Sequence, residues 1–541
     1  RRGLPIAYVV TSGNQAQQGF AAIGRALLDD PRVSALGLHV EGFGDLRAFE
    51  SLAAAAARCG KPLIVLKTGR SAAARQATLS HTASLAGSDA GANALLERLG
   101  VARVDTLPAL LETLKLVHVH GARGPLGSTP GDGERTVRLA SLSCSGGEAA
   151  LVADAAADDT PTDPSVRLLF PEPDAARRRA LRDALGPRVA LANPLDYDTG
   201  IWRDGEALER VYRAMSGDGI DLTLLVLDLP REDRCDTIDW AAPIAALERA
   251  ARASGARFAL VASLPENLPE HLGHRMIEAG IAPLAGIDDA LAAVRAAAAL
   301  DSRAAGDGYR PVLLRGAHAA EGTALVSEAE AKAALAAHGL SVPRGTRATS
   351  PEGAVDAAAA LGFPVVLKGE GIAHKSDAGA VALGMNDAEA VARAGRAMPC
   401  ATYLVEEMIA ARGVELLVGV VHDPAHGFVL TLGAGGVLTE VLVDRVSRLV
   451  PMTEREVNEA LGRLRIVRAL DRAASDRRAV CRAVLAVQTF AVAHAHELVE
   501  LEINPLLCTR DAAVALDALL VVAGDGAPPP TFPSPNARPD P

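Results

Sequence analysis

A histidine set among small residues is the first candidate for chemistry in this 541-residue chain. His81 stands in the stretch SHTASLAGSDA, residues 80–90, which contains little side-chain bulk. A neutral imidazole near pH 7 is a competent nucleophile toward phosphorus, provided that another group holds its second nitrogen. The stretch therefore indicates a histidine that accepts a phosphoryl group. The alternative is a loop histidine without a chemical role at the start of the following helix.

Glu41 is the candidate carboxylate for orienting this imidazole. It directly follows the apolar run VSALGLHV, residues 33–40. Open α/β sheets bind their ligands at the carboxyl ends of strands. A carboxylate at that position can accept the N–H of one ring nitrogen and leave the lone pair on the other. We therefore expect Glu41 and His81 to lie close together.

Two stretches share a plan that suits an anion, namely an apolar run, a turn with serine and glycine, and a helix. Such a turn leaves backbone N–H groups and the positive end of the helix dipole free for a phosphate. Most α/β domains contain one turn of this kind, but two predict a pair of helix ends facing one phosphate. The candidate phosphate-binding residues are Ser12, Gly13, Asn14, Ser145, Gly146 and Gly147.

The last third of the chain carries a second candidate site, for a nucleotide and a metal ion. One predicted strand ends at Lys368 and leads into a glycine-bearing loop with a second histidine, His374, and a later strand at residues 402–409 ends in two glutamates. Lysine at a strand end can neutralise phosphates. Mg²⁺ takes oxygen ligands and keeps several waters, so a few protein oxygens suffice. Asn504 and Asp517, at the ends of consecutive strands, supply such oxygens.

Composition and charge narrow the function classes. Only six of the 55 basic residues are lysine, so a surviving lysine indicates a position that needs a compact ammonium. The net charge of −11 argues against a nucleic-acid partner. The six scattered cysteines form no CxxC pair, which indicates reduced thiols instead of disulfides or a zinc site. No apolar run reaches the length of a membrane span and no signal peptide is visible, so we expect a cytoplasmic protein.

Alternating apolar runs and helical patterns predict an α/β protein of several domains. Apolar runs without polar alternation suit parallel sheets covered on both faces, and the first such run is residues 4–10. Gly/Pro-rich and polar segments separate the regions. We expect domains at residues 1–122, 135–300 and 323–525, followed by a disordered Pro-rich tail at 526–541.

Three motifs together resemble the ADP-forming (NDP-forming) acyl-CoA synthetases, relatives of succinyl-CoA synthetase. They are the stretch at residues 80–90, IAHKSD at 372–377, and EINPL followed by LD between residues 502 and 517. The resemblance covers nearly the whole chain. It implies two flavodoxin-like (succinyl-CoA-synthetase-like) parallel-sheet domains followed by an ATP-grasp domain. It also implies a ligase that interconverts acid, CoA and ATP with acyl-CoA, ADP and phosphate through a phosphohistidine and an acyl phosphate.

The resemblance implies a role for each candidate residue. His81 matches the phosphorylated histidine, Glu41 the glutamate that stabilises it, and His374 a second histidine that carries the phosphoryl group on a mobile loop. The two serine–glycine turns match the paired helices that hold the phosphate. The implied ATP-binding residues are Lys368, Lys375, Glu406, Glu407 and Glu415, and the implied magnesium ligands are Asn504 and Asp517.

The chain departs from the family pattern at several positions. Ala83 and Ala380 stand where the family has glycine, and Glu148 lies in the first turn of the second phosphate helix, where a carboxylate repels phosphate unless it points away. Single-chain members begin with a CoA-binding Rossmann domain, whereas this sequence starts after it. We therefore expect full turnover to need a CoA-binding domain from upstream or from a partner chain. A homo-oligomer is the expected assembly.

Three functions stay open at this point. The first is the ligase, with ATP, Mg²⁺, CoA and a small carboxylic acid as ligands. The second is a regulatory module that binds nucleotide and senses ligands, as in fusions with protein acetyltransferases, and the third is a non-catalytic subunit. The presence of His81 and the short Pro-rich tail favour the ligase. Residues 191–204 either contribute to the acid end of the site or form a plain Asn-Pro turn, so acetate, branched and aryl acids all remain candidates.

Overall fold

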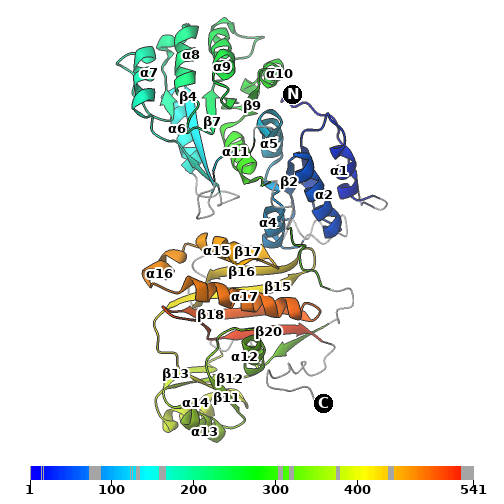
Figure 1. Cartoon of the computed structure of the whole chain (residues 1–541), viewed down its shortest axis with the longest axis vertical. Helices are drawn as coiled ribbons and strands as arrows, with labels where there is room; N and C mark the ends of the chain where they lie inside the picture. Colours follow the sequence, from blue (N-terminus) through cyan, green and yellow to red (C-terminus); the bar gives the residue numbers. More distant parts are fainter. Residues whose placement is uncertain are drawn as a thin grey trace. The chain divides into compact units, whose positions relative to one another are not determined.

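The chain divides into two units, Arg1–Tyr309 and Arg310–Pro541, in a computed structural model. Each unit has its own sheets and cores and is described by itself (Figure 1). The structure describes residues 2–13, 15, 18–71, 87–121, 124, 126–128, 135–157, 166–301, 309–315, 322–372, 378–436 and 444–524.

Three described strands of the first unit form a parallel sheet in the order β1-β2-β3. The central strand is buried along its whole length, as expected for a parallel strand covered on both faces. The strands are β1 (Leu36–Val40), β2 (Leu63–Lys67) and β3 (Ala102–Val104), and the helices of this part are α1 (Phe20–Leu28), α2 (Leu46–Cys59), α4 (Asp89–Arg98) and α5 (Leu107–His120).

The apolar run at residues 4–10, expected as the first strand, does not form a strand in the structure. Ile6, Val9 and Val10 are exposed. Pro5 has no N–H to donate to a ladder, and the Tyr8 hydroxyl donates a hydrogen bond to Asp30 Oδ2 at 2.5 Å. Strand-forming residues become a strand only when a neighbouring strand supplies hydrogen-bond partners, and β1 pairs with β2 instead.

A second, wholly parallel sheet of six described strands follows in the first unit. Its order is β5-β4-β7-β8-β9, with β6 paired to β4. The strands are β4 (Arg135–Ser143), β5 (Val166–Leu169), β6 (Leu195–Asp196), β7 (Leu222–Val226), β8 (Phe258–Ala262) and β9 (Ile281–Ala285). The helical segments are α6 (Gly146–Ala157), α7 (Ala175–Leu185), η2 (Thr199–Ile201), α8 (Gly205–Ala214), η3 (Ile238–Trp240), α9 (Ala241–Ser254), η4 (Pro265–Asn267), α10 (Glu270–Glu278) and α11 (Ile287–Ala299).

Helices cover both faces of this second sheet, because successive side chains of each strand point to opposite sides. Leu224 packs in a core with residues of α5 and α11, and this core also contains side chains of β2 and β3. Leu225, the next residue of β7, packs in the other core with residues of α8 and α9. The expected doubly covered parallel-sheet architecture is therefore present.

A buried charge cluster ties α5 to the second sheet. The Lys115 ammonium lies 2.6 Å from Glu112 Oε2, and both side chains are fully buried. The same oxygen of Glu112 accepts the backbone N–H of Ala285 in β9 at 2.9 Å, and Arg2 donates to the other oxygen. Burial lowers the pKa of Lys115, while the Glu112 charge opposes that change.

The second unit contains two antiparallel sheets. Seven described strands form one, with the order β10-β20-β18-β15-β16-β17 and β19 on β18, and four form the other, with the order β11-β14-β12-β13. The strands are β10 (Thr323–Val326), β11 (Gly345–Ala348), β12 (Val365–Gly369), β13 (Val381–Met385), β14 (Tyr403–Glu407), β15 (Val414–Asp423), β16 (Gly427–Ala434), β17 (Arg445–Leu449), β18 (Leu498–Cys508), β19 (Ala513–Ala515) and β20 (Ala518–Ala523).

Each sheet of the second unit packs against its own helices. Residues of α12, α15, α16 and α17 share one core with the seven-stranded sheet, and residues of α13 and α14 share another with the four-stranded sheet. The helices are α12 (Glu328–Ala337), α13 (Pro351–Leu361), α14 (Ala388–Ala397), α15 (Glu454–Gly462), α16 (Val467–Arg472) and α17 (Arg477–Ala493).

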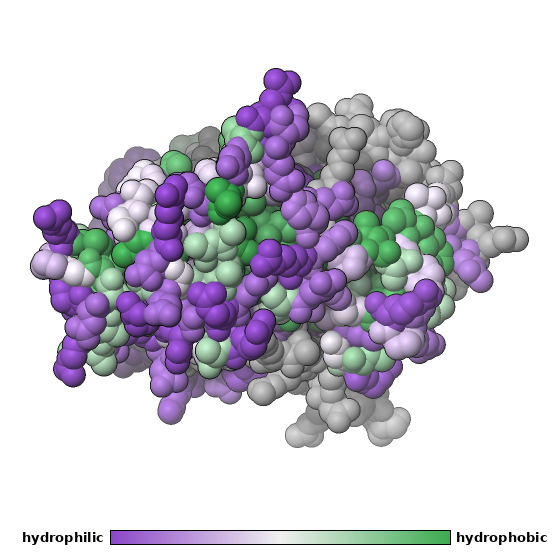
Figure 2. Space-filling model, turned by 90° about the horizontal axis from the view of Figure 1, so that it is seen from above, coloured by the Kyte–Doolittle hydropathy of each residue, from purple (hydrophilic) through white to green (hydrophobic). Residues whose placement is uncertain are grey.

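The surface carries hydrophilic residues around smaller hydrophobic areas on the face shown in Figure 2. Among the described residues, no helix combines the length and the apolar character needed to cross a membrane. All six cysteines lie in the described ranges and are free thiols, which agrees with the absence of a disulfide pattern in the sequence.

Candidate functional site

Lys368, the penultimate residue of β12, lies at the centre of a buried polar cluster in the second unit. Its Nζ is 2.7 Å from Glu328 Oε1 and 2.9 Å from Glu406 Oε2. It also donates a hydrogen bond to the carbonyl of Leu516. The cluster therefore brings side chains of α12, β12 and β14 together at the carbonyl of Leu516, which directly precedes Asp517.

Lys332 of α12 belongs to the same cluster, although the sequence analysis gave it no role. Its Nζ lies 2.8 Å from Glu328 Oε1 and 2.6 Å from Glu406 Oε1, and it donates to the Leu516 carbonyl at 2.7 Å. The rarity of lysine could have pointed to this residue, because Lys332 is one of only six lysines in the chain.

The charges of this cluster balance one another. Burial by itself lowers the pKa of Lys368, but the carboxylates of Glu328, Glu406 and Asp517 outweigh burial and hold that pKa above its usual value. The pKa of Lys332 is lowered, chiefly by burial and by the Lys368 cation beside it. Two buried lysines facing two buried glutamates are tolerated because each charge has partners of opposite sign within hydrogen-bond distance.

Glu406 and Glu407 were predicted together as ATP-binding residues. Their side chains lie on opposite faces of the four-stranded sheet. Neighbouring strand residues face opposite sides of a sheet. Glu406 is buried in the lysine cluster, whereas Glu407 is partly exposed and binds Arg344, which donates its backbone N–H at 2.9 Å and its Nε–H at 2.7 Å. The backbone and side chain of Arg344 lower the pKa of Glu407. The structure thus brings Glu406, and not Glu407, to Lys368.

The two predicted magnesium ligands adjoin each other. Ile503 of β18 pairs with Ala518 of β20, so the following residue Asn504 and the preceding residue Asp517 stand at neighbouring positions of the two strands. Asn504 Oδ1 accepts the N–H of Gly436 at 2.9 Å. Asp517 directly follows Leu516, whose carbonyl accepts hydrogen bonds from both lysines of the cluster. The charge of Asp517 also raises the pKa of Lys368.

Glu415 reaches the same region through Gly436. A Cβ atom added to Gly436 would lie 1.9 Å from Glu415 Oε2, so the carboxylate rests directly against the glycine backbone. Gly436 also has a positive φ of 63°, so a side chain there would strain the backbone and would have to displace the Glu415 carboxylate. Its contacts connect Glu415 to Asn504.

The donor set at Asn504 and Asp517 fits a magnesium ion that is shared with a nucleotide. Mg²⁺ prefers oxygen ligands and usually binds through one or two protein groups together with phosphates and water. Within the ranges that the structure describes, no group of three or more His, Cys, Asp or Glu side chains could hold a metal ion alone. The carboxylate of Asp517 and the amide oxygen of Asn504, at the edge of the lysine cluster, therefore suit an ion that is also bound by nucleotide phosphates and water.

The loop predicted to carry His374 and Lys375 starts and ends within the described ranges, but both residues lie outside them. The Gly369 N–H donates to the Ala380 carbonyl at 2.8 Å and closes the base of the loop. Gly371 and Gly379 have positive φ angles of 80° and 65°. Ala380 is buried and is not among the residues with positive φ, so alanine costs no backbone strain there.

In the first unit, Glu41 is exposed directly after β1, at the carboxyl edge of the first sheet. The buried Lys67 donates from Nζ to the Glu41 carbonyl at 2.8 Å, and the Thr68 N–H donates to the Val40 carbonyl at 3.1 Å. These bonds hold the chain at Glu41 in place. His81 and Ala83 lie outside the described residues, so the predicted pairing of Glu41 with His81 stays a prediction.

Ser145, Gly146 and Gly147 stand at the start of α6, directly after β4, as the sequence plan predicts. Both glycines are exposed, and the Ser145 carbonyl accepts the Ala149 N–H at 3.1 Å and the Ser143 hydroxyl at 2.9 Å. This arrangement presents the first backbone N–H groups of a helix that follows a parallel strand, which is suitable geometry for an anion.

Glu148 stands in the first turn of the same helix, and its environment changes its protonation. Burial, followed by the charges of Asp228 and Asp196, raises its pKa to about 7. Its Oε2 is buried without a hydrogen-bond partner among the described residues. Near neutral pH this carboxyl group is therefore protonated in a large fraction of molecules, which reduces the repulsion of phosphate that the sequence suggested.

The first serine–glycine turn is not directly continued by a helix. Ser12 and Gly13 are described, with the Ser12 carbonyl accepting the Gln15 N–H at 3.1 Å, whereas Asn14 lies outside the described residues. The helix α1 starts only at Phe20, whose N–H donates to Gln15 Oε1 at 3.0 Å. Of the two predicted phosphate turns, the structure places only the second directly at a helix N-terminus.

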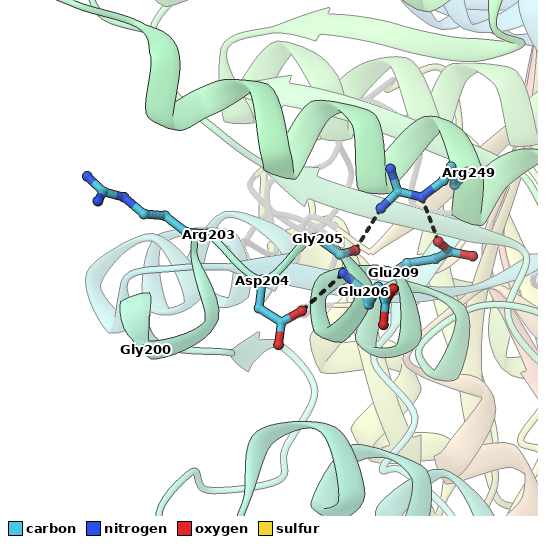
Figure 3. A pocket seen from close by; sticks show the side chains of 7 residues that line it. All are labelled: Gly200, Arg203, Asp204, Gly205, Glu206, Glu209 and Arg249. Carbon is cyan, nitrogen blue, oxygen red and sulfur yellow. Dashed lines mark hydrogen bonds and ion pairs between the residues drawn. The ribbon is translucent and has the colours of Figure 1, made fainter.

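A surface cavity of about 840 Å³ lies between η2, α8 and α9 (Figure 3). Arg249 points toward the start of α8, where it donates to Glu209 Oε2 at 2.7 Å and to the Gly205 carbonyl at 2.8 Å. Asp204 caps the first N–H groups of α8. Gly200, Arg203 and Asp204 of its lining belong to residues 191–204, the segment that the sequence offered for the acid end of the site or for a plain turn. Of the charged groups, Arg249 and Glu209 join α9 to α8, whereas Arg203 pairs with Asp239 at 2.9 Å.

Two family models match separate parts of the chain. Residues 1–117 match the succinyl-CoA ligase like flavodoxin domain, and residues 317–522 match the ATP-grasp domain. The flavodoxin-like match contains Glu41 and His81. The ATP-grasp match contains the lysine cluster, Asn504 and Asp517.

Curated relatives extend the match over nearly the whole chain. Trans-feruloyl-CoA synthase FCS1 from an unknown prokaryotic organism is 28% identical over 96% of this chain and 73% of its own length. Acetate–CoA ligase [ADP-forming] I of Archaeoglobus fulgidus is 27% identical over 96% of this chain and 75% of its own length. Acetate–CoA ligase [ADP-forming] I subunit beta of Pyrococcus furiosus is 30% identical and covers 36% of this chain and 90% of its own length.

Solved structures give partial matches. A dinucleotide forming acetyl-coenzyme A synthetase 1 of Ca. Korarchaeum cryptofilum, in complex with phosphate and ADP, covers 55% of this chain and 59% of its own, at 20% identity and a TM-score of 0.42. PH1788 from Pyrococcus horikoshii covers 37% of this chain and 92% of its own, at 28% identity and a TM-score of 0.35. From the curated relatives and the two family models, the chain belongs to the family of ADP-forming acyl-CoA synthetases.

Proposed function

We propose that this chain is an ADP-forming acid–CoA ligase, which converts a carboxylic acid, CoA and ATP to acyl-CoA, ADP and phosphate. The relatives that match most of the chain are named as acyl-CoA synthases or ADP-forming ligases. The observation that carries the proposal is the position of Asn504 and Asp517 beside the buried Lys368 cluster in the ATP-grasp domain. This arrangement combines a cation for phosphates with oxygen ligands for Mg²⁺.

In the proposed nucleotide site, Lys368 neutralises phosphate charge and Glu406 fixes the lysine. Asn504 and Asp517 would hold Mg²⁺ together with phosphate oxygens. When bound, the ion supplies further charge neutralisation on the phosphates. The predicted ATP-binding residues Lys375, Glu407 and Glu415 stay part of the proposal, with Glu415 held against Gly436.

The proposed transfer runs in four balanced steps. A ring nitrogen of His374 attacks the γ-phosphorus of ATP, so that a P–N bond forms, the bond to the ADP oxygen breaks and ADP leaves. A ring nitrogen of His81 then attacks the same phosphorus, so that its own P–N bond forms and the bond to His374 breaks. A carboxylate oxygen of the acid then takes the phosphoryl group and gives an acyl phosphate. The CoA thiolate attacks the acyl carbon and displaces phosphate. Glu41 accepts the N–H of the other ring nitrogen of His81, and His374 carries the phosphoryl group between sites.

The proposal assigns the phosphohistidine to a domain at residues 1–122, the second phosphate helix to residues 135–300 and nucleotide binding to residues 323–525. The N-terminus of α6, with Ser145, Gly146 and Gly147, binds the phosphoryl group opposite the turn at Ser12, Gly13 and Asn14. Self-association into a homo-oligomer is a further part of the proposal, which light scattering after gel filtration tests.

Incubation with γ-labelled ATP and Mg²⁺ tests the phosphohistidine directly. We expect an acid-labile, base-stable label on the native chain that His81→Asn abolishes. The matched control is His39→Asn, the same change at an exposed histidine of β1. Retention of full label in His81→Asn excludes this histidine as the acceptor.

Three further variants separate the roles. Glu41→Gln should weaken the phosphoenzyme while ADP binding stays intact, and His374→Ala should bind ADP but fail to label His81. Lys368→Met should weaken ADP binding by about 100-fold, because a charge-assisted contact is lost and a buried carboxylate pair is left short of a cation. Normal ADP binding by Lys368→Met in calorimetry would remove the nucleotide site from the cluster.

A further inference from the structure

Lys332 and Lys368 share one set of acceptors. Both ammonium groups lie within 2.9 Å of Glu328 Oε1 and of a Glu406 carboxylate oxygen. Both also donate to the carbonyl of Leu516. The two lysines come from α12 and β12, and each of the three acceptors therefore has two cationic donors.

This duplication has a consequence for nucleotide binding. A lysine ammonium has three N–H donors, and in Lys368 all three have protein acceptors within reach. Lys368 can turn an N–H toward a phosphate only by releasing one of those acceptors. A buried carboxylate or carbonyl left without a donor costs free energy, unless a second donor already satisfies it.

We propose that Lys332 is a positioning residue for nucleotide binding, which keeps Glu328, Glu406 and the Leu516 carbonyl bonded while Lys368 turns to the nucleotide phosphates. The inference rests on the proposed function, since it concerns the same nucleotide site. Lys332 itself stays in place, because it lies within α12 and is only 3% exposed. Lys368 stands one residue before the end of β12, which leads into the loop with His374, and it donates to the carbonyl of Leu516, the residue before Asp517.

Lys332→Met tests the inference by calorimetric titration with ADP. Without Lys332, Glu328 and Glu406 hold Lys368 more tightly, so we expect the Kd for ADP to rise at least 10-fold. The titration separates this effect from unfolding, since stoichiometry reports the folded fraction and Kd reports the site. An unchanged Kd in folded Lys332→Met overturns the inference.

Glu328→Gln gives the opposite expectation and does not depend on the stability of Lys332→Met. The amide removes one charged anchor from Lys368, so ADP should bind about three- to tenfold more tightly in the otherwise native chain. If Glu328 had only a structural role, the Glu328→Gln chain would bind ADP equally well or more weakly. Either of these results therefore overturns the inference. In the double variant Lys332→Met/Glu328→Gln, the Kd should return to within about threefold of the native value.

Lys115→Met is the matched control, because it removes another fully buried lysine that is paired with a glutamate, Glu112, in the other unit. It should lower thermal stability and leave the Kd for ADP unchanged. ADP binding by the native chain separates a failure of the proposed function from a failure of the role of Lys332. If it fails to bind ADP, the proposed function fails. If it binds ADP and Lys332→Met binds equally well, only the role of Lys332 fails.

Discussion

The two proposed phosphate sites compensate their buried carboxylates in different ways. In the second unit, Glu328 and Glu406 lie within hydrogen-bond distance of two lysines. In the first unit, Glu148 at the start of α6 is affected by burial and by two further carboxylates, Asp228 and Asp196, and its pKa rises to about 7. One site is neutralised by cations and the other by a proton.

The two proposed phosphate sites should therefore respond differently to pH. Lys368 keeps its charge through the neutral range, because its carboxylate partners hold its pKa above the usual value. The carboxyl group of Glu148, with a pKa of about 7, changes its charge in that range. The start of α6 is therefore expected to respond to pH near neutrality, whereas the charge of Lys368 is not.

The largest expected effect comes from removing a carboxylate of the cation-compensated cluster. Glu406→Ala leaves Lys332 and Lys368 with one carboxylate fewer in a buried environment, which should lower the free energy of unfolding by about 3–5 kcal/mol. Urea denaturation of the native and variant chains measures it. A loss below about 1 kcal/mol would show that the buried charges do not depend on each other.

Glu148→Gln tests the proton-compensated site. The folded form holds the Glu148 proton more tightly than the unfolded chain does, since its pKa is raised from 4.5 to about 7. The free energy of unfolding of the native chain should therefore fall as pH rises from about 4.5 to 7 and stay level above. The variant should lose this part of the pH dependence, about 1 kcal/mol after solvent screening. An identical pH profile for both chains contradicts the assignment.

Asp228→Asn tests the cause of the raised pKa of Glu148, and its expected effect on stability is smaller. Asp228 is the first of the two charges that raise the pKa of Glu148, after burial. Its neutralisation should move the midpoint of the stability change to lower pH without abolishing it. Thermal melts at half-unit steps between pH 4 and 8 measure this shift, and a midpoint that moves upward would contradict it.

Glu407→Ala should have the smallest effect and serves as the neighbour control for Glu406. Glu407 is partly exposed and pairs with Arg344 at the surface of the four-stranded sheet. An exposed ion pair contributes at most about 1 kcal/mol. If urea denaturation gave equal losses for Glu406→Ala and Glu407→Ala, the contrast between the buried and the exposed glutamate would be wrong.

The small number of lysines in the sequence has a physical reason that the structure makes visible. Of the five lysines in the described ranges, four are buried, namely Lys67, Lys115, Lys332 and Lys368. Each donates to a carboxylate or to a backbone carbonyl. A guanidinium is too large and too planar to replace an ammonium with several acceptors around one atom. The rarity of lysine indicated positions that need a compact ammonium, but it did not indicate that these lysines are buried or that Lys332 and Lys368 share their acceptors.

The fold class was predictable because hydrophobic periodicity depends on local sequence. Apolar runs such as residues 222–226 and 258–262 form buried parallel strands, and the glycines at 146 and 147 stand at a helix start as expected. The run at residues 4–10 is also apolar, but it forms no strand and Ile6, Val9 and Val10 are exposed, because a strand also needs a partner edge. Local pattern cannot supply that partner.

By itself the sequence determined the α/β class, the family resemblance and the residue types available for phosphate and metal chemistry, since these depend on composition and spacing along the chain. Only the tertiary structure decided that Glu406 and not its neighbour meets Lys368, that Lys332 joins them, and that the charges of Asp228 and Asp196 raise the pKa of Glu148. Such pairings join residues more than 30 positions apart in the chain. Their strength and protonation follow from burial and the distance between charges, which exist only in the folded molecule.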